Sequence, residues 1–143
     1  MIIQKTVGAF HGGSVEQYTM KNVHGMQVSV LNYGGIVRQI LFPDVQNVWD
    51  NRVLAYQDLK LYERNPMFLG AIIGRVAGRI RGAEFQLPGE RQKFFLERNE
   101  GHCHLHGGSQ GFCYRFWSVD AWSSVGEDVL NLRLTDLPQG GYP

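Results

Sequence analysis

The sequence predicts an all-β fold, and three observations support that prediction. Glycine is frequent, with 18 residues in 143, and aromatic residues make up 12% of the chain. Short stretches of alternating apolar and polar residues recur between turn signals, as where Leu130, Leu132 and Leu134 alternate with Asn131 and Arg133. Because strand side chains have a period of two, this pattern is typical of an all-β chain. The length is that of one ordinary domain with a core of its own.

In the first half of the chain, apolar stretches lie between glycine, asparagine and proline. Met26, Val28 and Val30 alternate with polar residues, and Pro43, which cannot donate to a sheet ladder, ends the next stretch. The elements expected here are a strand over 26–30, a break at 32–35, a strand over 36–42, a loop over 44–52 and a short helical turn at 58–62.

The second half opens with a glycine-rich segment, residues 70–82, written G-A-I-I-G-R-V-A-G-R-I-R-G. It is too short and too rich in arginine for a membrane helix, and it lacks the glycine pattern of a dinucleotide loop. It is therefore expected to form a strand and turn with its arginines on solvent. The other expected elements are a hairpin with strands at 83–87 and 92–96, a buried strand at 112–122, a half-buried strand at 130–134 and a loop over 136–143.

Composition and charge exclude several classes of partner. A formal net charge of +1 gives no electrostatic field that would attract nucleic acid or an acidic membrane. The two cysteines, Cys103 and Cys113, are too few for a disulfide framework. The N-terminal residues have no apolar stretch of signal-peptide length. These observations predict a cytoplasmic protein without nucleic-acid or membrane partners.

Three of the five histidines are concentrated in one pattern, H-x-H-x-H, formed by His102, His104 and His106. Gly107 and Gly108 follow directly. On a strand, all three imidazoles are expected to point to one face. The spacing leaves three interpretations open: a metal site, acid–base or hydrogen-bond chemistry on a polar substrate, and histidines with a purely structural place.

Several separate blocks of the sequence resemble the aldose 1-epimerase (galactose mutarotase) family. They occur in the order found in that family and together extend over most of the chain. The matching blocks are 31–35 (L-N-Y-G-G), 65–70 (N-P-M-F-L-G), 70–80 (G-A-I-I-G-R-V-A-G-R-I), 105–108 (L-H-G-G) with Gly111, Phe112 and Trp117, and 136–143, which is similar to D-G-E-E-G-Y-P cut short.

The resemblance implies a large antiparallel β-sandwich of the galactose mutarotase type, apparently truncated here, with residues 1–143 as the N-terminal portion of a single aldose 1-epimerase domain. It implies interconversion of the α and β anomers of a free aldose such as galactose or glucose, without a metal or cofactor. The small-molecule sugar is then the partner. Ring opening needs a base for the C1 hydroxyl and an acid for the ring oxygen. The resemblance places both groups, a glutamate and a histidine, beyond Pro143.

Within the chain, the resemblance assigns the substrate-binding residues Gly78, Arg79 and His106, and His106 is also the expected catalytic residue. Arg79 matches the family arginine that hydrogen-bonds the sugar and favours negative charge on oxygen. Gly78 stands where the family has asparagine, so one amide contact is absent. Arg75 is the alternative to Arg79, since the two would share a face of a strand, but the motif favours Arg79.

Two rival functions stay open at this point. A chain that holds a sugar without the acid and base would be a non-catalytic carbohydrate-binding module. The other possibility is a metal site on His102, His104 and His106, although the first two match no family ligand.

Overall fold

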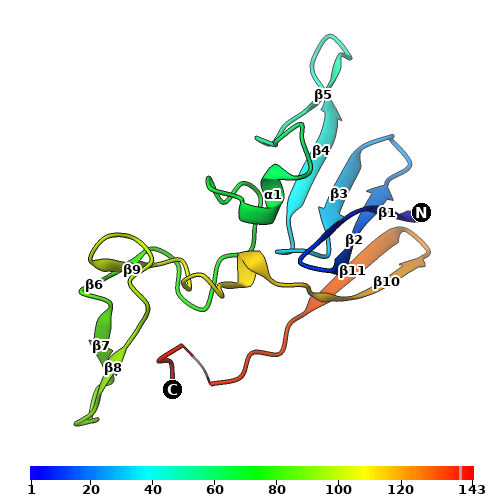
Figure 1. Cartoon of the computed structure of the whole chain (residues 1–143). Coiled ribbons are helices and arrows are strands. Elements are labelled where there is room, and N and C mark those ends of the chain that lie inside the picture. Colours follow the sequence, from blue (N-terminus) through cyan, green and yellow to red (C-terminus); the bar gives the residue numbers. More distant parts are fainter. Residues whose placement is uncertain (139) are drawn as a thin grey trace.

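The computed structural model describes residues 1–138 and 140–143, and its largest unit is a five-stranded antiparallel sheet. Each strand pairs with the next one along the chain (Figure 1). The strands are β1 (Ile2–Phe10), β2 (Gly13–Lys21), β3 (Gln27–Leu31), β4 (Val37–Pro43) and β5 (Trp49–Asn51). The all-β, antiparallel class predicted from the sequence is confirmed.

The predicted strands at 26–30 and 36–42 correspond to β3 and β4, but the loop predicted over 44–52 contains β5. Asp44 causes this difference. Its Oδ1 accepts hydrogen bonds from the N–H groups of Gln46 at 2.9 Å and Val48 at 2.8 Å, and the chain folds back to pair with β4. The first hairpin, β1–β2, escaped prediction because most β1 side chains are exposed and show no apolar face.

The rest of the described chain forms two-stranded ribbons and short helical turns. The ribbons are β6 (Arg79–Arg81) with β9 (Cys103–Leu105), β7 (Glu84–Gln86) with β8 (Lys93–Phe95), and β10 (Ser118–Ser124) with β11 (Glu127–Arg133). The helical elements are α1 (Leu61–Arg64) and a 3₁₀ turn, η1 (Phe112–Tyr114). The predicted hairpin around 88–90 and the predicted strand over 130–134 are confirmed, and α1 overlaps the helical turn expected at 58–62.

One prediction for the second half is wrong, and another holds only for part of its segment. Residues 112–122 do not form one buried strand, because η1 turns the chain and the following strand, β10, is mostly exposed. Within 70–82 only β6 is a strand. Hydrogen bonds to other segments replace a ladder there, such as those from Val37 N–H to the Gly70 carbonyl and from Phe112 N–H to the Gly74 carbonyl.

The core lies on one face of the five-stranded sheet, beneath α1 and the segment after it. Tyr33 is fully buried at its centre, with ring centroids 5.0 Å from those of Phe10 and Phe116 in edge-to-face contacts. Its hydroxyl donates to the Glu63 carbonyl at 3.0 Å, so α1 is tied to the sheet. Gly34 follows with a φ of +65°, and the Cys113 carbonyl comes too close for a side chain there.

The molecule is elongated (Figure 1). The five-stranded sheet and the β10–β11 ribbon occupy one end, and the ribbons formed by β6 to β9 occupy the other. Among the described residues, no helix combines the length and the apolar character needed to cross a membrane.

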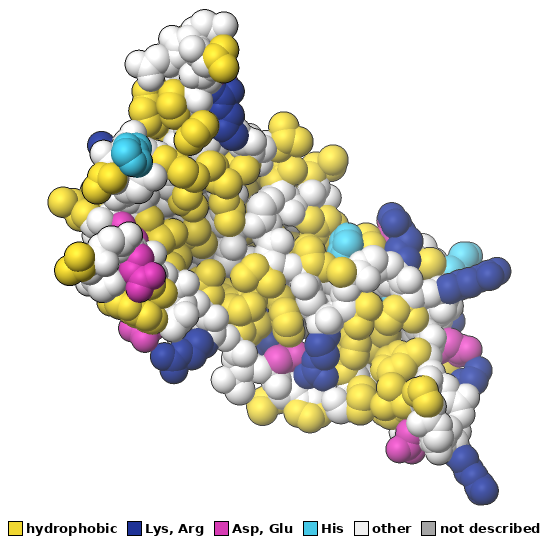
Figure 2. Space-filling model, turned by 180° about the vertical axis from the view of Figure 1, so that it is seen from behind, with side chains coloured by type: hydrophobic (Ala, Val, Ile, Leu, Met, Phe, Trp, Pro, Cys, Tyr) yellow, Lys and Arg dark blue, Asp and Glu magenta, His cyan; other side chains and the backbone are white. Residues whose placement is uncertain are grey.

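We expect residues 1–143 by themselves to self-associate. Figure 2 shows hydrophobic side chains spread over the back of both ends of the molecule. Exposed examples include Phe42, Phe95, which is 65% exposed, and Trp122. Such surfaces favour aggregation. Light scattering should show growing particles as concentration rises, together with a broad thermal transition. A monomer that melts sharply and independently of concentration would contradict this expectation.

Candidate active site

His106 lies in a left-handed turn just after β9, with a φ of +54°. Its N–H donates to the Gly78 carbonyl at 3.1 Å, and the Gly78 N–H donates to His106 Nδ1 at 3.0 Å. Because Nδ1 accepts this bond, the proton of the neutral ring resides on Nε2. The edge of the ring packs against Phe68, with centroids 4.7 Å apart. The site therefore holds His106 as an oriented Nε2–H donor.

Gly78 occupies the turn that makes this contact possible. Its φ is +83°, a conformation that side chains with a Cβ adopt at a cost. No atom lies within 4 Å of the position that a Cβ would take. The space that the asparagine side chain of the family motif would enter at this position is therefore open.

Arg79 follows at once as the first residue of β6, opposite Leu105 of β9. Its guanidinium forms a two-pronged ion pair with Glu100, with Nη2 2.6 Å from Oε1 and Nε bonded to Oε2. The hydrogen bonds from Arg79 lower the pKa of Glu100 against the opposing effect of desolvation, and the charge of Arg79 lowers it further. Nη1 is not used by this pair, and the arginine side chain is 60% exposed. It is thus oriented and still able to donate.

Glu100 lies outside the blocks that match the family, and no role was expected for it. Its only signal was its place just before the histidine pattern. The pairing with Arg79 joins residues 21 positions apart and depends on the β6–β9 ladder.

Arg75 does not share a face with Arg79, so that expectation is wrong. The reason is that residues before β6 are irregular rather than extended in a ladder. The Arg75 guanidinium binds Asp136 instead, with Nε 2.9 Å from Oδ2, and carbonyl oxygens further along the C-terminal segment.

The three histidines do not share one face either, because β9 has only three residues and the turn after it redirects His106. His102 is exposed in the turn before β9. His104 is 2% exposed; its Nδ1 donates to the Glu97 carbonyl at 2.8 Å, and its Nε2 accepts from the Tyr142 hydroxyl at 2.6 Å. In the part of the chain that the structure describes, no three His, Cys, Asp or Glu side chains are grouped to hold a metal ion.

Gly107 brings the His106 turn against the loop that carries Arg75. A Cβ at Gly107 would lie 1.8 Å from the Gly74 carbonyl oxygen, whereas a Cβ at Gly78 would meet nothing. Both residues have similar positive φ values, +88° and +83°.

Gly107→Ala is therefore expected to destabilise the protein by about 1–3 kcal/mol more than Gly78→Ala, because only the former forces backbone apart. The shared cost of the left-handed conformation cancels between the two variants. Urea unfolding at micromolar protein concentration measures the difference. Equal midpoints would show that the contact between Gly107 and Gly74 is not required.

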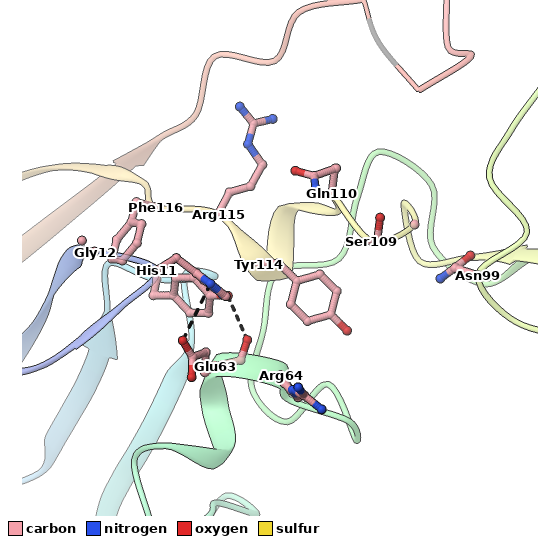
Figure 3. Close-up of a pocket in the computed structure, with 13 residues that line it drawn as sticks. His11, Gly12, Glu63, Arg64, Asn99, Ser109, Gln110, Tyr114, Arg115 and Phe116 are labelled. Carbon is pink, nitrogen blue, oxygen red and sulfur yellow. Dashed lines mark hydrogen bonds and ion pairs between the residues drawn. The ribbon is translucent and has the colours of Figure 1, made fainter.

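A hollow of about 960 Å³ is lined in part by Ser109 and Gln110, which follow the His106 turn (Figure 3). It is lined from several elements, including Asn99, Gly108 and Tyr114, with His11 at 3.7 Å from the Glu63 carboxylate on its other side. Neither Arg79 nor His106 is among its lining residues. The hollow thus borders the histidine turn, but none of the expected substrate-binding residues Gly78, Arg79 and His106 lines it.

The chain is similar in sequence to several known sugar epimerases. A family model described as aldose 1-epimerase matches residues 16–143. The chain is 35% identical over 135 residues to the maltose epimerase of Levilactobacillus brevis, covering 94% of this chain and 38% of that one. It is 33% identical to an aldose 1-epimerase of Lactobacillus helveticus, covering 90% of this chain and 94% of that one.

The fold agrees with a solved relative. The crystal structure of galactose 1-epimerase from Lactobacillus acidophilus superimposes with a TM-score of 0.82 at 26% identity, covering 96% of this chain and 39% of that one. The chain thus spans about two fifths of the length of the first relative and of this structure.

Proposed function

The chain belongs to the aldose 1-epimerase family, and we propose that residues 1–143 form the N-terminal portion of a single aldose 1-epimerase domain. In this proposal the whole protein interconverts the α and β anomers of a free aldose such as galactose or glucose. A sugar with a free anomeric carbon is the chemistry common to the names of its relatives. A cytoplasmic location, and the lack of nucleic-acid and membrane partners, stay predictions.

One observation supports this function above the others: Gly78 N–H fixes His106 as an Nε2–H donor, and the next residue, Arg79, keeps an exposed guanidinium. Anomer exchange passes through ring opening, in which charge shifts between the C1 oxygen and the ring oxygen. A neutral imidazole donor and a permanently charged guanidinium are suited to bind those oxygens and to favour the developing charge. Gly78 takes part through its backbone, and Glu100 holds Arg79 in place.

The steps that move protons need a base and an acid, and the resemblance assigns these to residues beyond Pro143. The part of the site in this chain then binds and orients the sugar. A non-catalytic carbohydrate-binding role would use the same residues. That role would be indicated if the missing C-terminal acid and base are supplied and the sugar is bound but not converted.

The binding half of this proposal can be tested with a matched pair of variants. Arg79 and Arg81 are both exposed arginines of β6, two residues apart, but only Arg79 belongs to the proposed site. In saturation-transfer NMR with galactose, glucose or maltose, we expect Arg79→Met to abolish most of the sugar signal and Arg81→Met to retain it. Equal signals from both variants, or none from the unmodified chain, would contradict the assignment of this site.

A further inference from the structure

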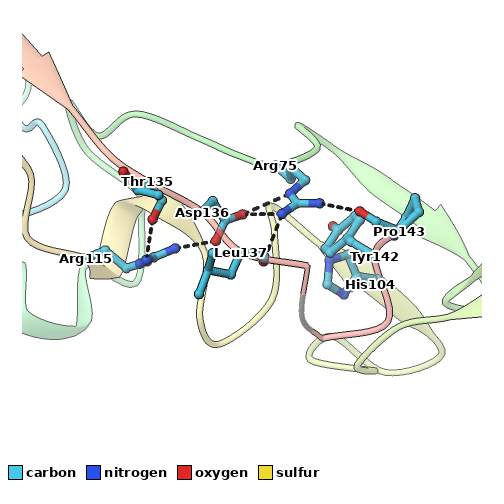
Figure 4. Close-up of polar contacts among 8 residues, drawn as sticks. All are labelled: Arg75, His104, Arg115, Thr135, Asp136, Leu137, Tyr142 and Pro143. Carbon is cyan, nitrogen blue, oxygen red and sulfur yellow. Dashed lines mark hydrogen bonds and ion pairs between the residues drawn. The ribbon is translucent and has the colours of Figure 1, made fainter.

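The C-terminal segment crosses from β11 to the far end of the molecule and is attached there at two points (Figure 4). We call residues 135–138 and 140–143 the strap. The proposed function gives no role to this segment, to Arg75 or to His104. Both residues bind the strap at the ribbon end of the molecule.

Arg75 is the first attachment point. Its Nε and Nη2 both lie 2.9 Å from Asp136 Oδ2, Nη2 donates to the Leu137 carbonyl at 3.1 Å, and Nη1 donates to the Pro143 carbonyl at 3.1 Å. The guanidinium also lies 5.2 Å from the centre of the Tyr142 ring. Every nitrogen of this side chain is therefore engaged by the strap.

Asp136 receives a second arginine on its other oxygen, since Arg115 Nη1 donates to Oδ1. Burial by itself would raise the pKa of Asp136, but the hydrogen bonds from Arg75 and Arg115 outweigh it and lower the pKa below its ordinary value. The carboxylate is therefore charged at neutral pH and holds both guanidinium groups.

His104 is the second attachment point. The Tyr142 hydroxyl donates to its Nε2 at 2.6 Å, and the two rings meet edge to face with centroids 5.6 Å apart. Gly141 passes so close to β8 that a Cβ would lie 1.7 Å from the Phe95 carbonyl oxygen. The strap thus fits tightly against the ribbon end of the molecule.

The two attachment points flank the contact that orients His106. Arg75 lies three residues before Gly78, and His104 lies two residues before His106. The strap therefore joins the two chain segments whose meeting forms the hydrogen bond from Gly78 N–H to His106 Nδ1. We propose that Arg75 and His104, through the strap, are positioning residues that hold His106 in its Nε2–H form. The significance for catalysis rests on the proposed function, but the positioning itself does not.

The alternative is that the β6–β9 ladder alone holds the pair, since Arg79 is opposite Leu105 in it. Chemical reactivity distinguishes the two. Diethylpyrocarbonate acylates a free imidazole lone pair, and His106 has none while Nδ1 accepts from Gly78 and Nε2 carries the proton. His102, exposed in the same region of the chain, provides an internal reference for the reagent.

The test compares Arg75→Met with the control Arg81→Met, at micromolar concentration and about pH 8, where an ordinary imidazole is neutral. Mass spectrometry measures acylation of His106 relative to His102, and thermolysin measures cleavage before Leu137 as a readout of strap release. We expect Arg75→Met to raise both rates about tenfold or more, because charge-assisted hydrogen bonds are lost, and Arg81→Met to change neither.

A second variant guards against a general loss of structure. Tyr142→Phe keeps the ring over Arg75 and removes only the hydroxyl bonded to His104, so we expect rises of about fivefold in both rates with an unchanged circular dichroism spectrum. If either variant frees the strap while His106 stays as unreactive as in the control, the ladder alone positions it and the proposal is wrong. It is also wrong if Arg75→Met leaves the strap protected. Absence of sugar binding in the unmodified chain would overturn the proposed function without changing these outcomes.

Discussion

Residues 1–143 by themselves are expected to leave the interconversion of α-galactose and β-galactose at its rate in buffer. Arg79 and His106 can bind and orient a sugar, but the resemblance places the proton-transferring glutamate and histidine beyond Pro143. General acid or base catalysis typically contributes about a hundredfold to ten-thousandfold for each group. Polarimetry of freshly dissolved α-galactose, with and without the purified chain, measures this directly.

Supplying the C-terminal remainder of a relative, such as the maltose epimerase of Levilactobacillus brevis, should raise the rate by the same large factor. The matched control is that C-terminal piece alone, which lacks Arg79 and His106 and is expected to be inactive. Turnover by residues 1–143 at an enzymatic rate would overturn the expectation. It would direct attention to Glu100 and His106, the carboxylate and imidazole that the chain itself brings near each other.

In an active protein that contains this chain, His106→Ala is expected to lower kcat/KM by about 30-fold to 1,000-fold. This corresponds to about 2–4 kcal/mol of transition-state stabilisation, the usual loss when one preorganised donor is removed from such a site. The change removes the Nε2–H donor, although the backbone bond from His106 N–H to the Gly78 carbonyl can persist. Polarimetric rates over a range of galactose concentrations give kcat and KM separately.

His102→Ala is the matched control, since it deletes an imidazole four residues earlier that is exposed and makes none of these contacts. We expect its kcat/KM to stay within about twofold of the unmodified protein, as for exposed residues away from a site. Equal losses in the two variants would show that His106 is not the histidine that contacts the sugar.

Much of the fold was predictable because it depends on local patterns. Alternation over 26–30 and 130–134 and the turn at 88–90 predicted β3, β11 and the β7–β8 hairpin correctly. The exceptions are segments whose conformation depends on distant partners. β5 forms where Asp44 turns the chain back on β4. Residues 70–78 form no sheet ladder, and their backbone carbonyls accept hydrogen bonds from Val37 and Phe112 instead.

For the site, the sequence by itself determined which residues to consider: the L-H-G-G block selected His106, and the G-R-x-x-x-R pattern offered two arginines. It also led to the expectation that the three histidines share one face of a strand, and that the two arginines do so as well. A period of two applies only while a strand lasts, and β9 ends after three residues.

Only the tertiary structure decided which of the two arginines and which of the histidines belongs to the proposed site. Arg75 and Arg79 have the same chemistry, but Arg75 is hydrogen-bonded to the strap, whereas Arg79 is hydrogen-bonded to Glu100 and stays exposed to solvent. His104 and His106 are two residues apart, yet one is buried against Tyr142 and the other faces Gly78. The physical reason is that hydrogen-bond partners fix the proton and orientation of an imidazole or the direction of a guanidinium, and here those partners come from segments far away in the sequence.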